Sequence, residues 1–461
     1  MADRPSLVAN VAWTMGARAL SQVLSYLTFL VIAHRLGDTG VGQYTFVYAT
    51  LGLGAILCHP GLEGYLVREL GQRPADAPRL AMQALMLKAA LSVLSFGATL
   101  AWVSATGKDH RVLVAAGVAA ITHALQALDA VPSALLVAEE RMGLIAFAQV
   151  LERGGALAGV AALLTPGRDV VAVCTALLAS TIASTLVHLA GLRGRRWEWA
   201  APDLAVLRRM SVDALPFGLT QVFLYVYFRI DSVMLSMISG DAATGVYSVA
   251  DRTLEAVLFL PSAILAAVYP RLVRQAAEDE DGYLETAGNT LDVLVRLAIP
   301  AVVGLVLVSR GLIELLYGPA FAGSAPILSV LALALFFAFF NTFLGLQLNA
   351  RRQEQGYAAV AGAAALFNIV LNAILIPGRA GIGAAWATAA SELFCFLCFV
   401  RLLAGVLPRI FRWRVLAQAV GASALMAAAL VHAPPLPVLA QVLVGVAVYG
   451  LATGLAMLAA R

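Results

Sequence analysis

Six cationic side chains lie inside long apolar stretches of this sequence, where a charge is costly. Arg18 stands in an otherwise uncharged stretch that runs from residue 7 to residue 33. The other five are Lys88, Arg153, Arg229, Arg252 and Arg296. A charge near the middle of a membrane span costs roughly 2.5–3.5 kcal/mol, so such a side chain faces a partner or a water-filled cavity. These cations are the first candidates for contact with an anionic substrate.

The composition is that of an integral membrane protein. Of 461 residues, 61% are hydrophobic and 13% charged, and the mean hydropathy is +0.86. A soluble domain carries about 25% charged residues, and a membrane helix needs about 20 apolar ones. We expect an all-α polytopic protein with fourteen spans: 7–33, 42–60, 80–103, 112–137, 142–165, 170–192, 211–239, 243–270, 290–309, 324–349, 357–377, 380–404, 412–432 and 436–459.

The loops between these spans predict the orientation. With the N-terminus in the cytoplasm, 19 Lys and Arg fall in cytoplasmic segments and 6 on the opposite side. Short cytoplasmic loops carry an excess of Lys and Arg, so both termini are predicted to be cytoplasmic. The net charge of +4 then reflects topology, and we expect no nucleic-acid partner.

No motif in the sequence indicates catalysis. Cys395 and Cys398 form a C-x-x-C inside an apolar span with no His or further Cys nearby, which favours packing over a redox or metal pair. The predicted outer loops are short, whereas a membrane polymerase or ligase needs catalytic groups there. We expect no enzyme activity, no metal and no cofactor.

The chain repeats itself at an offset of 203 residues. Gly37, Asp38, Gly42 and Tyr44 match Gly240, Asp241, Gly245 and Tyr247, and Arg68 matches Arg271. Six spans separate the copies, so both enter the membrane in the same direction, as in transporters with parallel repeats. We expect an N-lobe at 1–195, a linker at 196–210, a C-lobe at 211–404 and two appended helices at 405–461.

The first span of each repeat carries a one-sided polar stripe. The stripes are Asn10, Thr14, Arg18, Ser21, Gln22, Ser25 and Thr28 in span 1, and Asp213, Thr220, Gln221, Tyr225, Arg229, Ser232 and Ser236 in span 7. Spacings of three and four put each set on one helix face. Such a face packs on other helices or lines water. Because helix packing does not require an arginine, we favour a central water-filled cavity, with Arg18, Gln22, Gln221, Arg229 and Arg252 contacting the substrate.

The charges of spans 7 and 8 lie at similar depth. Arg229 precedes the turn at Gly240 by eleven residues, and Asp251 and Arg252 follow it by eleven and twelve. At 1.5 Å per residue these groups lie roughly 16 Å from the turn, with Asp231 and Glu255 nearby. We expect ion pairs such as Arg229–Asp251 or Asp231–Arg252, which either lock two helices together or change partners as a gate.

The same depth argument applies to the other charged spans. Asp129 and Arg153 flank the turn near Glu140 at eleven and thirteen residues, which predicts a pair with a structural or coupling role. Asp292 and Arg296 are spaced for an in-helix pair. Lys88 is shallow enough to extend its ammonium to the interface. Glu392 has no neighbouring charge in its span, so we expect it to be protonated or to line a cavity.

The sequence also resembles a known family. The first half carries His34-Arg35-Leu36-Gly37, Gly42-Gln43-Tyr44, Gly61-Leu62 and Leu66-Val67-Arg68-Glu69. The second carries Leu215-Pro216, the run from Ile230 to Ser236, Gly245-Val246-Tyr247 and Tyr269-Pro270. Over its whole length the chain is similar to Wzx-type polysaccharide and O-antigen flippases. That family belongs to a superfamily with the lipid II flippases and multidrug extruders, whose two six-helix lobes surround a central cavity.

The resemblance implies a substrate and partners. The substrate would be an undecaprenyl-diphosphate-linked oligosaccharide, moved from the inner to the outer leaflet of a bacterial cytoplasmic membrane for surface polysaccharide synthesis. A polysaccharide polymerase and other export proteins would be partners. Arg18 matches an arginine expected in the first helix of lipid II flippases. Lipid II flipping and multidrug antiport stay open as alternatives.

Overall fold

The computed structural model describes residues 7–58, 62, 66, 69, 76–194, 201–434 and 436–458, without the side chains of 7–12, 15, 57 and 213–220. Throughout these ranges the secondary structure is helical and contains no strand. The chain divides into two compact units, Met1–Met237 and Ile238–Arg461, which are described separately.

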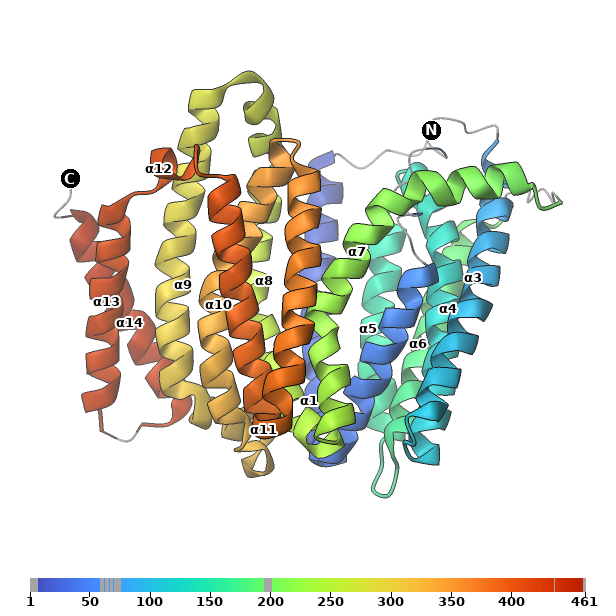
Figure 1. The fold of residues 1–461 in the computed structure, drawn as a ribbon, viewed down its shortest axis with the longest axis horizontal. Coiled ribbons are helices and arrows are strands. Elements are labelled where there is room, and N and C mark those ends of the chain that lie inside the picture. Colours follow the sequence, from blue (N-terminus) through green and yellow to red (C-terminus); the bar gives the residue numbers. More distant parts are fainter. Residues whose placement is uncertain are drawn as a thin grey trace. The chain divides into compact units, whose positions relative to one another are not determined.

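In the part of the first unit that the structure describes, helices alternate with short turns (Figure 1). They are α1 (Leu7–Ala55), η1 (Ile56–Cys58), α3 (Ala77–Ala105), α4 (His110–Ala138), α5 (Met142–Leu163), α6 (Val170–Gly191) and α7 (Leu204–Ile238). α1 packs chiefly on α5, and α6 packs on α4 and α5. Small residues allow this close approach: a Cβ added at Gly159 of α5 would lie only 3.1 Å from the Cβ of Ala176 of α6.

The second unit consists of further helices and one short 3₁₀ turn in its described part. They are α8 (Asp241–Glu278), α9 (Glu280–Tyr317), η2 (Pro319–Phe321), α10 (Ser324–Ala350), α11 (Glu354–Leu402), α12 (Leu407–Ile410), α13 (Trp413–His432) and α14 (Val438–Leu458). α10 is the most buried and packs on α8, α9 and α11. The α8–α9 turn extends past the ends of α10 and α11 (Figure 1). The sequence predicted a longer loop between these spans, from residue 270 to 290.

The fourteen predicted spans correspond to the observed helices. Within the described residues, twelve helices are long and apolar enough to cross a membrane. Two of the twelve each contain two predicted spans, because non-helical backbone interrupts α1 at Gly37 and α11 at Ala380. The predicted class, an all-α multi-pass membrane protein, is therefore confirmed.

The backbone of the turns confirms the internal repeat. Gly37 has φ 67° and ψ −170°, and Gly240, 203 residues later, has φ 87° and ψ 173°. Such φ values favour glycine, which explains the residue type at both turns. Three later turns recur in the same order, each with positive φ in both units: Gly107 with Gly318, Glu140 with Arg352, and Gly167 with Ala380. The predicted match of Arg68 with Arg271 is not compared, because Arg68 lies outside the described residues.

The start of α7 packs into the first unit. Met210 is fully buried in a cluster with Leu62, Ala77 and Val131. Just before α7, the backbone N–H of Asp203 donates to Gln83 at 3.0 Å, and Gln83 donates to the carbonyl of Ala201 at 2.7 Å. α7 therefore groups with the first unit by its contacts. The lobe boundaries predicted at 195 and 211 follow the repeat instead and stay a prediction.

Candidate substrate-contacting and coupling residues

Arg18 is exposed on α1 and makes no hydrogen bond or ion pair with any residue that the structure describes. Trp13, Leu20, Val23 and Leu27 are also exposed on this helix, at spacings of seven, three and four residues. At 100° per residue these apolar side chains lie on the side of the helix opposite Arg18. α1 thus has an apolar face suited to lipid, and on its other side the exposed cation Arg18.

The other members of the α1 stripe differ in burial. Ser21 and Thr28 are buried, and the Thr28 hydroxyl donates to the carbonyl of Leu24 in its own helix at 2.8 Å. Gln22, one turn from Arg18, is half-buried. The side chain of Asn10 lies outside the described residues. Two members of the stripe are therefore buried in the protein, and a water-lined position of the others stays a prediction.

The polar stripe of α7 is also used in part for packing within the first unit. The Tyr225 hydroxyl donates to the carbonyl of Tyr48 at 3.3 Å, and a Cβ added at Gly52 would overlap the Tyr225 ring. Ser236 accepts from the Lys108 ammonium at 2.8 Å. Gln221 is exposed, like Arg18. The side chains of Asp213 and Thr220 lie outside the described residues.

The charged side chains on either side of the α7–α8 turn all take part in interactions. In α8, Arg252 donates to Glu255 at 2.7 Å, an in-helix pair three residues apart. In α7, Asp231 is buried and accepts from the backbone N–H of Ser232 at 2.6 Å. Arg229, Asp231 and Asp251 each take part in further interactions, so none of them is free. Their assignment to a lock or to a gate stays a prediction.

Asp129 pairs with a residue that the sequence argument missed. Its carboxylate lies 2.9 Å from Nδ1 of His188 on α6, and the two side chains are 15% and 8% exposed. The predicted pair of Asp129 with Arg153 is therefore wrong. Equal distance from a turn indicates depth but not which face of a helix a side chain occupies. The signal that could have identified His188 is its position as a lone histidine near the end of an apolar helix.

The two neighbouring charges on α5 have other environments. Glu152 accepts from Gln126 of α4 at 3.1 Å and from Thr181 of α6 at 3.1 Å. Arg153 is half-buried and lies within electrostatic reach of Tyr48. The coupling role predicted for Asp129 and Arg153 therefore concerns two separate sites. Asp129 is paired with His188 at one of them, and Arg153 lies at the other.

Two predictions about isolated cations are wrong. Lys88 does not extend to the membrane interface. It is fully buried, on the same side of α3 as the buried residues Ala84 and Ser92. Arg296 does not pair with Asp292, because Asp292 accepts from Arg412, next to the start of α13. Arg412 is remote in sequence, so residue spacing within one helix could not identify this pair.

Glu392 lies in a buried polar cluster of the second unit. It is 6% exposed, and the Asn341 amide donates both to its carboxylate at 2.7 Å and to its backbone carbonyl at 2.8 Å. On the same helix, Asn372 donates to Asn368 at 2.8 Å. Asn368 in turn donates to the hydroxyl of Ser391 in the second half of α11 at 3.3 Å. These amides connect α10 and the two halves of α11, so Glu392 is a packed side chain and not an isolated one.

Two repeats of six membrane helices, with charged groups held at depth, form a transporter fold. Solved structures agree. The lipid II flippase MurJ in an inward closed conformation matches with a TM-score of 0.81 at 14% identity, covering 96% of this chain and 98% of that one. An inward-facing multidrug resistance transporter of the MATE family matches with a TM-score of 0.67 at 16% identity, covering 85% and 98%. At these identities the likeness concerns the fold alone.

Sequence comparison identifies the family. The model of the family described as "Polysaccharide biosynthesis protein" matches residues 7–275, more than half of the chain, and the MatE model matches residues 216–374. The chain belongs to the polysaccharide biosynthesis protein family.

Two relatives come from the archaeon Haloferax volcanii. A probable low-salt glycan biosynthesis flippase, Agl15, is 24% identical over 373 residues, which are 80% of this chain and 77% of the relative. A probable flippase, AglR, is 29% identical over 181 residues, or 38% of each chain.

Proposed function

We propose that this protein is a flippase for a lipid-linked oligosaccharide. It would move an undecaprenyl-diphosphate-linked repeat unit from the inner to the outer leaflet of a bacterial cytoplasmic membrane. Membership of the polysaccharide biosynthesis family, the relative Agl15 and the transporter fold support this assignment. The product would feed the synthesis of a surface polysaccharide, with a polymerase as a downstream partner.

The observation that carries the proposal is the state of Arg18. It is exposed on a membrane-spanning helix, on the side away from the apolar face, and has no partner among the described residues. A permanent cation in that position needs an anion or water. A lipid diphosphate supplies the anion while its polyprenyl chain stays in the bilayer. A guanidinium also matches phosphate oxygens by two parallel hydrogen bonds.

The charge of Arg18 also favours this substrate over a cationic drug. The fold does not separate the two, since the flippase MurJ and a MATE transporter both resemble the chain. An extruder of cations needs acidic groups facing its substrate. In the first unit, Asp129 is paired with His188 and Glu152 accepts two hydrogen bonds, whereas the charge exposed on the first span of α1 is the cation Arg18.

We further propose alternating access as the mechanism. Arg18 and Gln22 would contact the diphosphate, and Arg229 and Arg252 would exchange partners among Asp231, Asp251 and Glu255 as access switches. An H⁺ or Na⁺ gradient or the membrane potential would supply the energy. Both termini would face the cytoplasm.

Complementation tests the role of Arg18. The host is a strain that lacks its O-antigen or capsule flippase, and surface glycan is measured at equal membrane levels of each variant. We expect Arg18→Ala to reduce export at least about tenfold, because a hydrogen bond to a charged group contributes about 1.5–3 kcal/mol. Arg18→Lys keeps the charge without the two-pronged geometry and should retain part of the activity.

Arg310→Ala is the matched control. Arg310 is another exposed cation, but it already pairs with Glu314 in its own helix at 2.9 Å. Its loss should leave export unchanged. Wild-type export by Arg18→Ala would refute the contact of Arg18 with the diphosphate. Failure of the wild-type chain to restore export in any such host, although it is inserted at a normal level, would refute the proposed function.

A further inference from the structure

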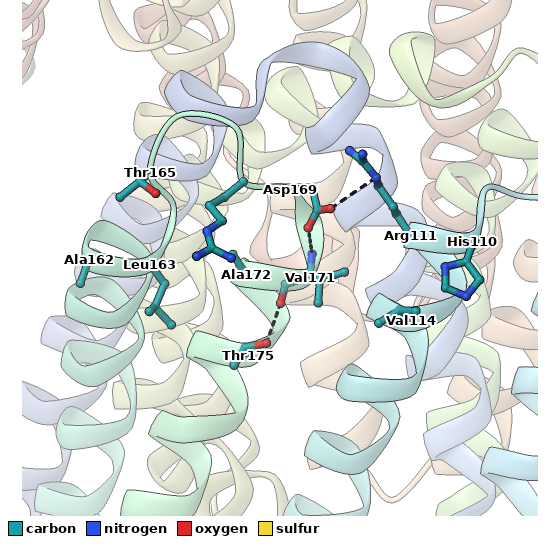
Figure 2. Close-up of a pocket in the computed structure, with 11 residues that line it drawn as sticks. His110, Arg111, Val114, Ala162, Leu163, Thr165, Asp169, Val171, Ala172 and Thr175 are labelled. Carbon is teal, nitrogen blue, oxygen red and sulfur yellow. Dashed lines mark hydrogen bonds and ion pairs between the residues drawn. The ribbon is translucent and has the colours of Figure 1, made fainter.

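A basic pocket lies where the start of α4, the end of α5 and the start of α6 meet. Its volume is about 560 Å³. Figure 2 shows residues from all three helices around it, among them His110, Leu163, Asp169 and Thr175. Arg111 and Arg168 also line it. The pocket belongs entirely to the first unit, and none of its residues contributes to the site proposed above.

The positive charge of this pocket is only partly neutralised. Nε of Arg111 lies 3.7 Å from the carboxylate of Asp169 (Figure 2). Asp169 is also occupied with the start of α6, where it accepts from the backbone N–H of Val171 at 3.0 Å. The exposed side chain of Arg168 makes no hydrogen bond or ion pair within the described part of the chain. Two guanidinium groups and one carboxylate leave a net positive charge.

The remaining wall of the pocket is apolar. Val114 and Leu163 are 39% and 44% exposed, and Ala162, Val171 and Ala172 complete this side. Free phosphate gains nothing from such a wall because it is fully hydrated. A phosphate with a hydrocarbon chain attached can place the chain on the wall and its charge near the arginines. The combination therefore fits an anionic amphiphile.

The distribution of cations adds a second argument. Of the six Lys and Arg predicted on the side opposite the termini, four belong to the first unit: Arg35, Lys108, Arg111 and Arg168. Arg35 donates to the carbonyl of Ala161 at 2.6 Å, and Lys108 donates to Ser236 at 2.8 Å. Arg111 faces Asp169, so three of the four have an intramolecular partner. Cations are disfavoured on this side, which leaves Arg168 as the one that internal contacts do not explain.

We propose that this pocket binds the phosphate group of a lipid in the leaflet opposite the termini. Arg168 contacts the phosphate, Arg111 contributes a second guanidinium, and the lipid chain lies on Val114 and Leu163. On the orientation proposed above, this is the leaflet that receives the flipped lipid. The pocket is thus a second lipid-phosphate site, distinct from Arg18.

Binding to the purified full chain in phosphatidylcholine nanodiscs tests the pocket separately from transport. Every variant carries Arg18→Ala, so that the site on α1 does not contribute. The probe is undecaprenyl phosphate. We expect Arg168→Gln to raise its Kd about threefold and Arg111→Gln with Arg168→Gln about tenfold, since solvent screens exposed pairs. Arg310→Gln, another exposed cation, should leave the Kd unchanged.

The choice of probe distinguishes the possible sources of the phosphate. Tighter binding of undecaprenyl phosphate than of phosphatidylglycerol supports the transported lipid as the occupant, and equal binding supports a membrane phospholipid. Both results agree with a lipid-phosphate site. Equal affinity for inorganic phosphate would overturn it, as would an unchanged Kd in the double variant with a normal unfolding temperature. A failure of glycan export has no bearing on this measurement.

Discussion

At the scale of single residues, the buried charges of this protein differ in whether they have a partner. Asp129 and His188 contact each other within the first unit, and Arg412 contacts Asp292 within the second. Glu392 is held by an amide instead of a cation. Arg18 differs from all of these because it is exposed and its charge has no counterpart among the described residues.

The Asp129–His188 pair should contribute to stability. Asp129→Asn or His188→Gln leaves the other member buried without its partner, which costs about 1–3 kcal/mol in the free energy of unfolding. Because both substitutions remove the same contact, their effects should be less than additive. The midpoint of thermal unfolding in detergent measures them.

Asp109→Asn provides the comparison for this pair. Asp109 is exposed beside the start of α4, and its side chain makes no capping hydrogen bond there. Its replacement should leave the midpoint unchanged. Fully additive effects of Asp129→Asn and His188→Gln would mean that the two side chains do not interact.

The sequence could predict which charges lie within apolar segments, but neither the burial of each side chain nor all of their partners. Lys88, Arg153 and Arg296 lie within apolar segments, and counting residues from a turn gives their depth. The partner depends on the helix face and on which helices are neighbours. Neither is available from one span taken separately, which is why His188 and Arg412 were missed.

At the scale of elements, the turns of the two units match in backbone conformation. Four turns recur in the same order in both units, and each pair shares a positive φ. Glycine occupies both members of only two pairs, Gly37 with Gly240 and Gly107 with Gly318. The sequence could therefore reveal the first turn of the repeat by its residues. The turns at Glu140 and Arg352 share a backbone conformation without sharing a residue type, so sequence matching could not find them.

Substitution of Gly240 tests the requirement for positive φ. Its φ is 87°, and open space surrounds the position of an added Cβ. Gly240→Ala should therefore lower the free energy of unfolding by about 1–2 kcal/mol through backbone strain alone. Chemical unfolding in mixed micelles measures this change.

Gly97→Ala is the matched control, and its expected effect on the free energy of unfolding has the opposite sign. Gly97 lies within α3 at ordinary helical φ, also with open space around it. Alanine is favoured over glycine in a helix interior by about 1 kcal/mol, so this variant should be at least as stable as the wild type. Destabilisation of both variants to the same degree would contradict the role assigned to the backbone of Gly240.

At the scale of the whole molecule, composition and the lengths of the apolar segments predicted more than residue chemistry did. The fourteen apolar segments correspond to helices because span length is set by the thickness of the bilayer. The start of α7 was less predictable. Met210 and the residues before it bind the first unit, although the repeat assigns this helix to the second copy.

Reporter fusions check the predicted orientation. Alkaline phosphatase, which is active only outside the cytoplasm, should be active when fused after Gly167 and inactive when fused after Glu140 or at the C-terminus. Green fluorescent protein should give the opposite pattern at the same three positions. Activity of the phosphatase after Glu140 would reverse the orientation, and with it the leaflet assigned to the pocket at Arg168.

The matching turns at Gly37 and Gly240 also define which positions of the two copies are equivalent. At the offset of 203 residues, the counterpart of Arg18 is Gln221, and both are exposed. The duplicated scaffold therefore carries a cation at this position in one copy and an uncharged amide in the other. On the function proposed above, a diphosphate would find this cation in one copy alone, so the two copies would not bind it equivalently.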